Sequence, residues 1–81
     1  MPAYRGVVLM TSWQVERFCL LHQTDDVAVQ CGAGTFTGRP VGVRFARAQR
    51  RQCLRLSERP GVVREIPVEA ILALTATARG R

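Results

Sequence analysis

The sequence predicts a mainly β fold: an N-terminal helix followed by a five-stranded, strongly bent antiparallel small barrel. Between residues 26 and 77, apolar side chains recur at every second position in short runs, which is the period of half-buried strands. Over residues 12–22 they recur instead every three or four positions, which is typical of a helix. A chain of 81 residues buries one small core, so we predict a single domain over 1–81.

The predicted helix begins at a capping box, in which Thr11 is followed three residues later by Gln14. Neither glycine nor proline interrupts the next residues, so the helix is expected over about 12–22. The residues at helical spacing that are expected to face the core are Val15, Phe18, Cys19 and His22, widened by Trp13, Leu20 and Leu21. Three turns are marginal alone, so this stripe must dock on the sheet.

The five predicted strands lie near 27–31, 41–47, 53–57, 62–66 and 72–77. The glycine-rich stretch over 32–38 is read as a sharp bend, because a strand follows it and not the helix of a phosphate-binding loop. Pro60–Gly61 predicts a hairpin turn, and residues 68–71 a single helical turn. The core residues that this alternation predicts are Phe18, Val29, Val43, Phe45, Leu54, Leu56, Ile66 and Leu74.

The cysteines and the N-terminus suggest no special chemistry. Cys19, Cys31 and Cys53 are odd in number and widely spaced, so we expect reduced, mostly buried thiols in a cytoplasmic protein, with no metal or cofactor. His22 is expected at a helix end. Residues 1–10 are read as an extended lead-in, because the run Val7–Met10 is too short for a signal peptide or a membrane span.

The charge is unusual, because all 12 basic residues are arginine against 6 acids, for a net charge of +6. Arginine suits phosphate through its planar donor fork and also stacks on bases. A GC-rich genome produces the same excess without selection for binding. The strand alternation places Arg44, Arg55 and Arg64 outward on neighbouring strands.

These arginines predict a stripe that follows a phosphate backbone. The residues of the predicted nucleic-acid-binding site are Arg44, Arg47, Arg50, Arg51, Arg55 and Arg64. The expected partner is RNA or single-stranded nucleic acid. The alternative is a protein-interaction module, with no nucleic-acid binding, that acts on an acidic partner or on itself through exposed strand edges. An enzyme is not expected, since paired carboxylates and a partnered histidine are lacking.

The order of elements resembles the Sm-like fold, in which a helix precedes five bent antiparallel strands and a single 3₁₀ turn links the fourth strand to the fifth. The resemblance covers about 12–77 and is most telling over 62–75, VVREIPVEAILALT. In length and layout the chain is similar to the small bacterial antiterminators that bind the termination factor Rho, and its end to the Sm-like part of WYL domains.

Three departures limit what the resemblance implies. The family's uridine pocket needs an Asp or Asn after the second strand and an Arg-Gly or Lys-Gly step after the fourth, whereas this chain has neither and carries Ile66–Pro67 at the second place. Pro67 also argues against the standard Sm ring, although a homo-oligomer stays open. The Rho-binding relatives use an acidic surface, which a +6 chain lacks.

Overall fold

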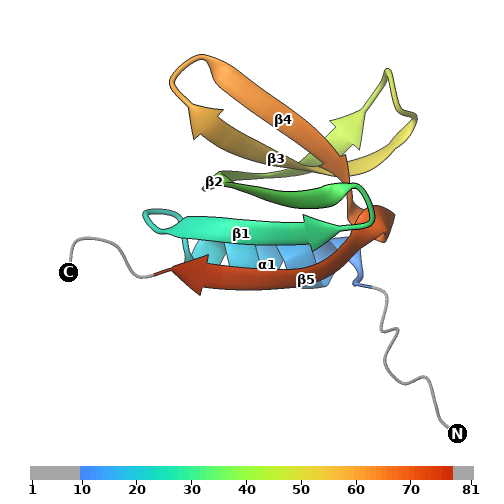
Figure 1. The fold of residues 1–81 in the computed structure, drawn as a ribbon. Helices are drawn as coiled ribbons and strands as arrows, with labels where there is room; N and C mark the ends of the chain where they lie inside the picture. Colours follow the sequence, from blue (N-terminus) through green and yellow to red (C-terminus); the bar gives the residue numbers. More distant parts are fainter. Residues whose placement is uncertain (1–9, 78–81) are drawn as a thin grey trace, which may run out of the picture.

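The computed structural model describes residues 10–77 (Figure 1), so the predicted lead-in before residue 10 and the basic tail 78–81 lie outside the described residues. The elements in chain order are α1 (Ser12–Leu21), β1 (Asp26–Cys31), β2 (Gly34–Ala46), β3 (Arg51–Arg59), β4 (Val62–Pro67), the 3₁₀ turn η1 (Val68–Ala70) and β5 (Ile71–Thr77). The predicted helix, the number and order of the five strands and the short link before β5 are therefore confirmed. The predicted start of the second strand near residue 41 is wrong, because β2 already begins at Gly34, where it pairs with β1.

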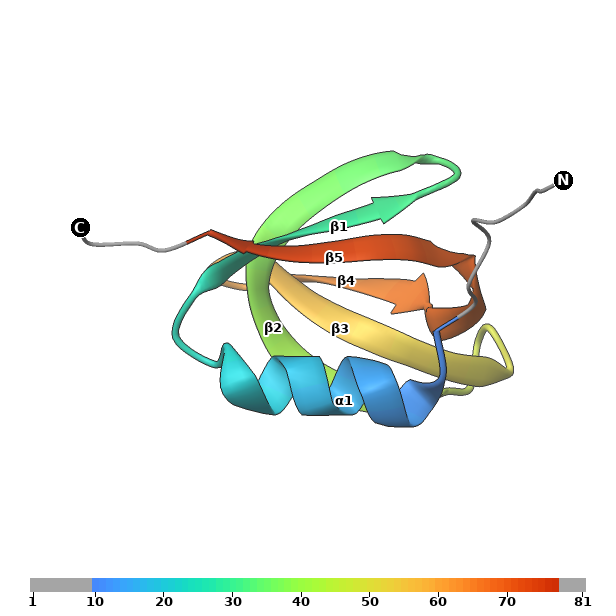
Figure 2. The same cartoon turned by 90° about the horizontal axis from the view of Figure 1, so that it is seen from below.

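The helix begins as the sequence predicts. The Thr11 hydroxyl accepts a hydrogen bond from the Gln14 amide at 3.1 Å, and the Gln14 side chain accepts one from the Thr11 amide at 2.9 Å. This reciprocal box satisfies two amides that the first turn would otherwise leave unpaired. The helix ends at His22, and α1 lies against β2 and β3 (Figure 2).

All strand pairs are antiparallel, in the order β4-β3-β2-β1-β5. β2 joins the two halves of this sheet, since its first part pairs with β1 and its second part with β3. As a result the β3–β4 half lies at an angle to the β1–β5 half (Figure 1). Among the described strands, β4 and β5 do not pair with each other. The predicted closure into a barrel is thus not shown, and within residues 10–77 the sheet has two open edges.

Gly38 occupies the place where β2 changes partners. It pairs with Val27 of β1, and the next residue, Arg39, pairs with Ser57 of β3. A Cβ atom at Gly38 would lie 2.4 Å from the Ser57 carbonyl oxygen, closer than two such atoms can approach. The glycine-rich stretch therefore provides a bend, as predicted, because the backbone of β3 passes against it.

The core lies between the inner face of the sheet and α1. Its buried residues are Val15, Cys19, Val27, Val29, Cys31, Leu54, Leu56, Ile66, Val68 and Ile71. Of the predicted core, Val29, Leu54, Leu56 and Ile66 are confirmed as buried. Phe18, Val43 and Leu74 pack against this cluster while only partly buried.

Phe45, a predicted core residue of β2, and Val41, which shares its phase in a regular strand, are both exposed, each for its own reason. Val41 is 55% exposed because the register shifts between Pro40 and Gly42, which leaves Val41 without a partner in β3. Phe45, also 55% exposed, pairs with exposed Gln52 one step from the β2–β3 turn, beyond the last core pair. The prediction of Phe45 as a core residue is wrong.

The helix stripe is narrower than predicted. Val15 and Cys19 are buried and Phe18 is half-buried, but Trp13, Leu20 and Leu21 are exposed. Trp13 instead carries the guanidinium of Arg17 above its ring, 5.6 Å from the centroid.

Cys19 makes the stability of the fold sensitive to alkaline pH. Burial raises the pKa of its thiol to about 11, with a smaller contribution from Glu16. In the unfolded chain the thiol has its usual pKa of 9.0, so the stabilisation is complete below that pH and is lost as the pH rises toward 11. We expect the free energy of unfolding in urea to fall by roughly 2 kcal/mol over this range. The Cys19→Ala variant should lose much of this decline; an equal decline in both proteins would contradict the assignment.

Candidate nucleic-acid interface

Hydrogen bonds within the β2–β3 turn, and one from the turn to β4, fix the backbone that carries its arginines. The Arg50 amide donates to the Ala46 carbonyl at 2.7 Å, and Arg50 adopts a left-handed φ of 57°. The Gln49 side chain donates to the Glu65 carbonyl of β4 at 3.3 Å, and Nε of Arg51 donates to the Gln49 carbonyl at 3.2 Å. These bonds tie the turn to β4, so the side chains that it carries project from a fixed backbone.

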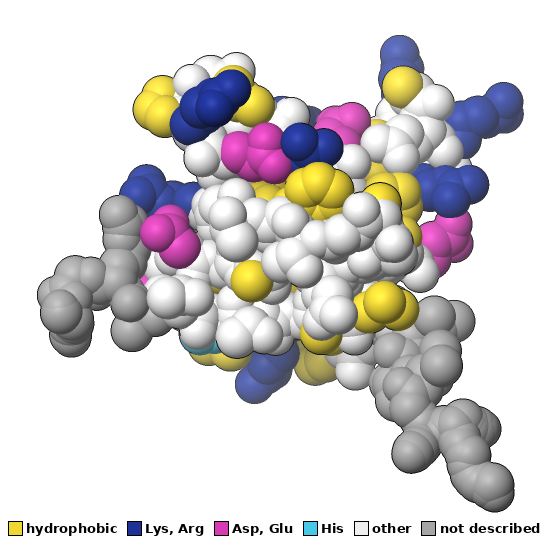
Figure 3. All heavy atoms as spheres, viewed as in Figure 1, with side chains coloured by type: hydrophobic (Ala, Val, Ile, Leu, Met, Phe, Trp, Pro, Cys, Tyr) yellow, Lys and Arg dark blue, Asp and Glu magenta, His cyan; other side chains and the backbone are white. Residues whose placement is uncertain are grey.

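Five of the six predicted site arginines gather around this turn. We call them the turn cluster: Arg44, Arg47, Arg50, Arg51 and Arg55. Figure 3 shows basic side chains grouped at the end of the molecule where β2 and β3 meet. Within residues 10–77, the guanidinium groups of Arg44, Arg47 and Arg50 have no acidic partner, which leaves their donors available to an anion.

A shallow hollow separates two members of the turn cluster. Arg55 pairs with Gly42, and Arg44 with Cys53, so both arginines lie on the outer face of the sheet. Gly42 has no side chain to fill the space between them, and the hollow, of about 230 Å³, is lined by both arginines together with residues 41–43. Arg55 and Glu65 approach only to 3.9 Å, longer than a hydrogen bond. The Arg55 charge is therefore only partly offset.

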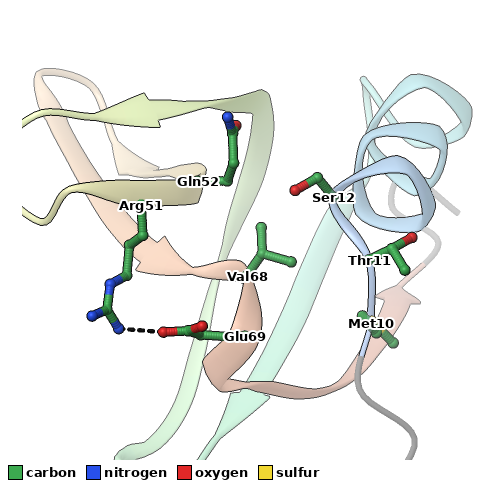
Figure 4. Close-up of a pocket in the computed structure, with 7 residues that line it drawn as sticks. All are labelled: Met10, Thr11, Ser12, Arg51, Gln52, Val68 and Glu69. Carbon is green, nitrogen blue, oxygen red and sulfur yellow. Dashed lines mark hydrogen bonds and ion pairs between the residues drawn. The ribbon is translucent and has the colours of Figure 1, made fainter.

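Arg51 stands beside a second hollow, of about 310 Å³, between the start of α1, the start of β3 and η1 (Figure 4). Its guanidinium forms an ion pair with Glu69, and both side chains are well exposed. Figure 4 shows Arg51 and Glu69 pointing toward each other along one side of the hollow, with Val68 between them and Ser12. Because the Glu69 carboxylate already pairs with it, Arg51 is the member of the turn cluster least able to bind an added anion.

Arg64 does not belong with the other five. It pairs with Leu56 in the β3–β4 register, so it lies on the inner face, opposite to Arg44 and Arg55. Its Nε donates to Glu58 at 2.5 Å and its guanidinium covers the Phe36 ring at 4.2 Å from the centroid. The hydrogen bond and the charge of Arg64 hold the pKa of Glu58 below its usual value. The prediction that Arg64 continues the stripe is wrong in geometry, because Arg64 lies on the same face of β4 as the buried Ile66.

Sequence reasoning missed an exposed aromatic beside the turn cluster. Phe45 lies between Arg44 and the turn and is 55% exposed, as is Val41 at the bulge. Nucleic-acid-binding surfaces combine cationic groups with aromatic rings on which bases stack. For Val41 the available signal was the glycine at position 42, since a glycine inside a strand often marks a bulge that breaks simple alternation. For Phe45 it was the position at the end of the strand, next to the arginine-rich turn.

The remaining polar groups of the described region offer little other chemistry. His22 is the C-cap of α1, and its Nδ1 lies 2.9 Å from Oδ2 of Asp25, so it is a helix-end histidine as predicted. The three cysteines are free and buried. Residues 10–77 contain no group of three or more His, Cys, Asp or Glu side chains placed to bind a metal. No helix within that range has the length and apolar character needed to cross a membrane.

Comparison of the chain with protein-family models, with curated proteins and with solved structures found no match.

Proposed function

We propose that this protein is a small Sm-like module that binds RNA or single-stranded nucleic acid through the turn cluster. The observation that carries the proposal is the set of three exposed guanidinium groups, Arg44, Arg47 and Arg50, which have no acidic partner in the described chain and project from the end of β2 and the hydrogen-bonded turn that follows it. Three such groups can contact successive phosphates of a flexible strand.

In the mechanism that we propose, arginine charges bind the phosphates and an aromatic ring stacks on a base. The arginines attract and hold phosphates, and the hollow at Gly42 accepts a phosphate between Arg44 and Arg55. Phe45 lies on the opposite face of β2, next to the turn, and supplies a ring on which one base of a strand that passes round the turn stacks. Stacking of this kind tolerates any base, so the module binds with little sequence preference. The order of one helix, five antiparallel strands and a 3₁₀ turn before β5 supports the Sm-like assignment.

The proposal departs from the uridine recognition of the Sm family. The β2–β3 turn contains neither Asp nor Asn, and the end of β4 is Ile66–Pro67. Arg51 and Glu69 form an ion pair beside the start of α1, so neither side chain is free to bind a base there. The proposed surface is therefore the outer face of β2 and β3 with the turn, and not a uridine pocket.

Charge reversal within the turn cluster tests the proposal. The Arg44→Glu/Arg47→Glu variant should weaken binding of a ~10-nucleotide single-stranded RNA about tenfold or more at low salt, equally for all sequences. Two lost phosphate contacts should also lower the slope of log K against log salt by about 1.4. Fluorescence anisotropy at two or more salt concentrations measures both quantities.

The matched control changes the same net charge elsewhere. Arg17 lies on the exposed side of α1 and Arg59 at the end of β3, both outside the turn cluster. The Arg17→Glu/Arg59→Glu variant should keep most of the affinity and the wild-type slope. Equal losses in both variants would mean that only the overall charge matters. If the wild-type protein does not bind the single-stranded RNA at ~50 mM salt, the proposal fails. The protein-interaction alternative, with an acidic partner, then replaces it.

A further inference from the structure

The two open edges of the sheet differ in how well they are protected. Proteins that leave a strand edge free usually guard it with charged side chains, prolines or bulges, because an unguarded edge pairs with other chains. β4 is guarded: it contains Arg64 and Glu65, and it ends at Pro67, which has no amide hydrogen to donate. An approaching strand would meet charge on this edge and find one hydrogen bond missing.

β5 has almost none of these protections. Its sequence, ILALTAT, contains no charged residue, no proline and no glycine. One edge pairs with β1, and no described strand pairs with the other (Figure 1). The register with β1 shifts only at Leu72, between the pairs Gln30–Ala73 and Cys31–Ile71, so 73–77 is a regular strand. Leu72 itself is 54% exposed beside this edge.

We propose that β5 pairs with β5 of a second copy of this chain, in an antiparallel arrangement around a twofold axis. This pairing goes beyond the proposed function and does not depend on it. It joins the two five-stranded sheets into one continuous sheet. Because both partners are uncharged, the contact brings no like charges together, which a β4–β4 contact would do.

The twofold axis is placed at Thr75, the centre of the regular stretch 73–77. Thr75 then faces Thr75 of the second copy on the outer side of the sheet, as a cross-strand pair of hydroxyl side chains. Leu74 faces Ala76 on the inner side, where both already pack against the core in part. The pairing thus covers apolar surface that one chain alone leaves half-exposed, and it satisfies the outward backbone groups of β5.

The axis position gives a direct test by charge. Thr75 is exposed and on the outer face, so replacing it should leave the fold intact, which circular dichroism checks. Sedimentation velocity of the wild-type protein should give twice the 9.0 kDa mass of one chain at micromolar concentrations. Thr75→Lys and Thr75→Asp should each raise the dimer dissociation constant about tenfold or more, because like charges would meet at the axis. Mixing the two variants should restore the dimer.

The control lies on the other edge. Val63 of β4 is 42% exposed, and Val63→Lys should leave the dimer unchanged. A wild-type protein that stays monomeric at hundreds of micromolar, or a mixture of the Lys and Asp variants that does not reassociate, would overturn the proposal. An assembly larger than a dimer that Val63→Lys disrupts would assign the contact to β4 with β5. None of these outcomes would change RNA binding by the turn cluster, so the dimer proposal can fail while the proposed function stands, and the reverse.

Discussion

Replacing Leu54 with alanine is expected to destabilise the fold by about 2–5 kcal/mol. Leu54 is 1% exposed and lies at the centre of the inner face, paired with Val43 of β2 on one side and Ile66 of β4 on the other. Removing its side chain leaves a cavity among residues that the backbone pairing holds in place. Small domains are stable by only ~5–15 kcal/mol, so the loss is a large part of the total. Urea denaturation measures it.

Phe45→Ala is the matched comparison, since it removes a larger apolar side chain from the neighbouring strand. Its side chain is 55% exposed, so the variant should lose less than about 1 kcal/mol. If Phe45→Ala costs as much as Leu54→Ala, Phe45 belongs to the core and the core extends to the end of β2.

The second large effect is expected at Gly38, where β2 passes from β1 to β3. The added Cβ of Gly38→Ala would meet the Ser57 carbonyl oxygen at 2.4 Å, and that oxygen belongs to backbone that cannot rotate away. One of the two strands must move, which typically costs ~1–3 kcal/mol and occasionally more. Thermal or urea unfolding should show the loss.

Gly32→Ala provides the control for this substitution. Gly32 lies in the turn between β1 and β2, and a Cβ there would meet no atom within 4 Å. The variant should stay within about 0.5 kcal/mol of the wild-type protein. A loss at Gly32 equal to that at Gly38 would show that glycine flexibility, and not close packing of the strands, explains the effect.

The element order of the fold could be predicted because each element has a local signal. The capping box at Thr11 and Gln14 sets the start of α1, and Pro60–Gly61 sets the β3–β4 turn, where Gly61 has a φ of 83°. What alternation cannot supply is the register. A single extra residue, Val41, changes the phase of β2, and Phe45 is exposed because the core ends before it. Whether the sheet closes depends on tertiary geometry between β4 and β5 that has no local signal.

The candidate site was predictable in part for the same reason. Charge and spacing locate Arg44, Arg47 and Arg50 near one turn, since they are close in sequence. Arg64 comes from a separate strand, and its face depends on which residue of β3 it opposes, which is Leu56. Its bond to Glu58 and its contact with Phe36 join side chains from three strands, a combination that single-strand patterns do not contain.

The most direct test of the proposed function is a nuclear magnetic resonance titration of the isotope-labelled protein with a ~10-nucleotide single-stranded RNA at ~50 mM salt. The turn cluster should respond: amide signals over 41–55 should shift with added RNA, while those of β4 and of the exposed side of α1 stay in place. The shifts should diminish as salt is raised, because phosphate contacts release counterions. Saturating RNA that moves no signal, or shifts confined to residues outside 41–55, would contradict the assignment of the turn cluster as the nucleic-acid interface.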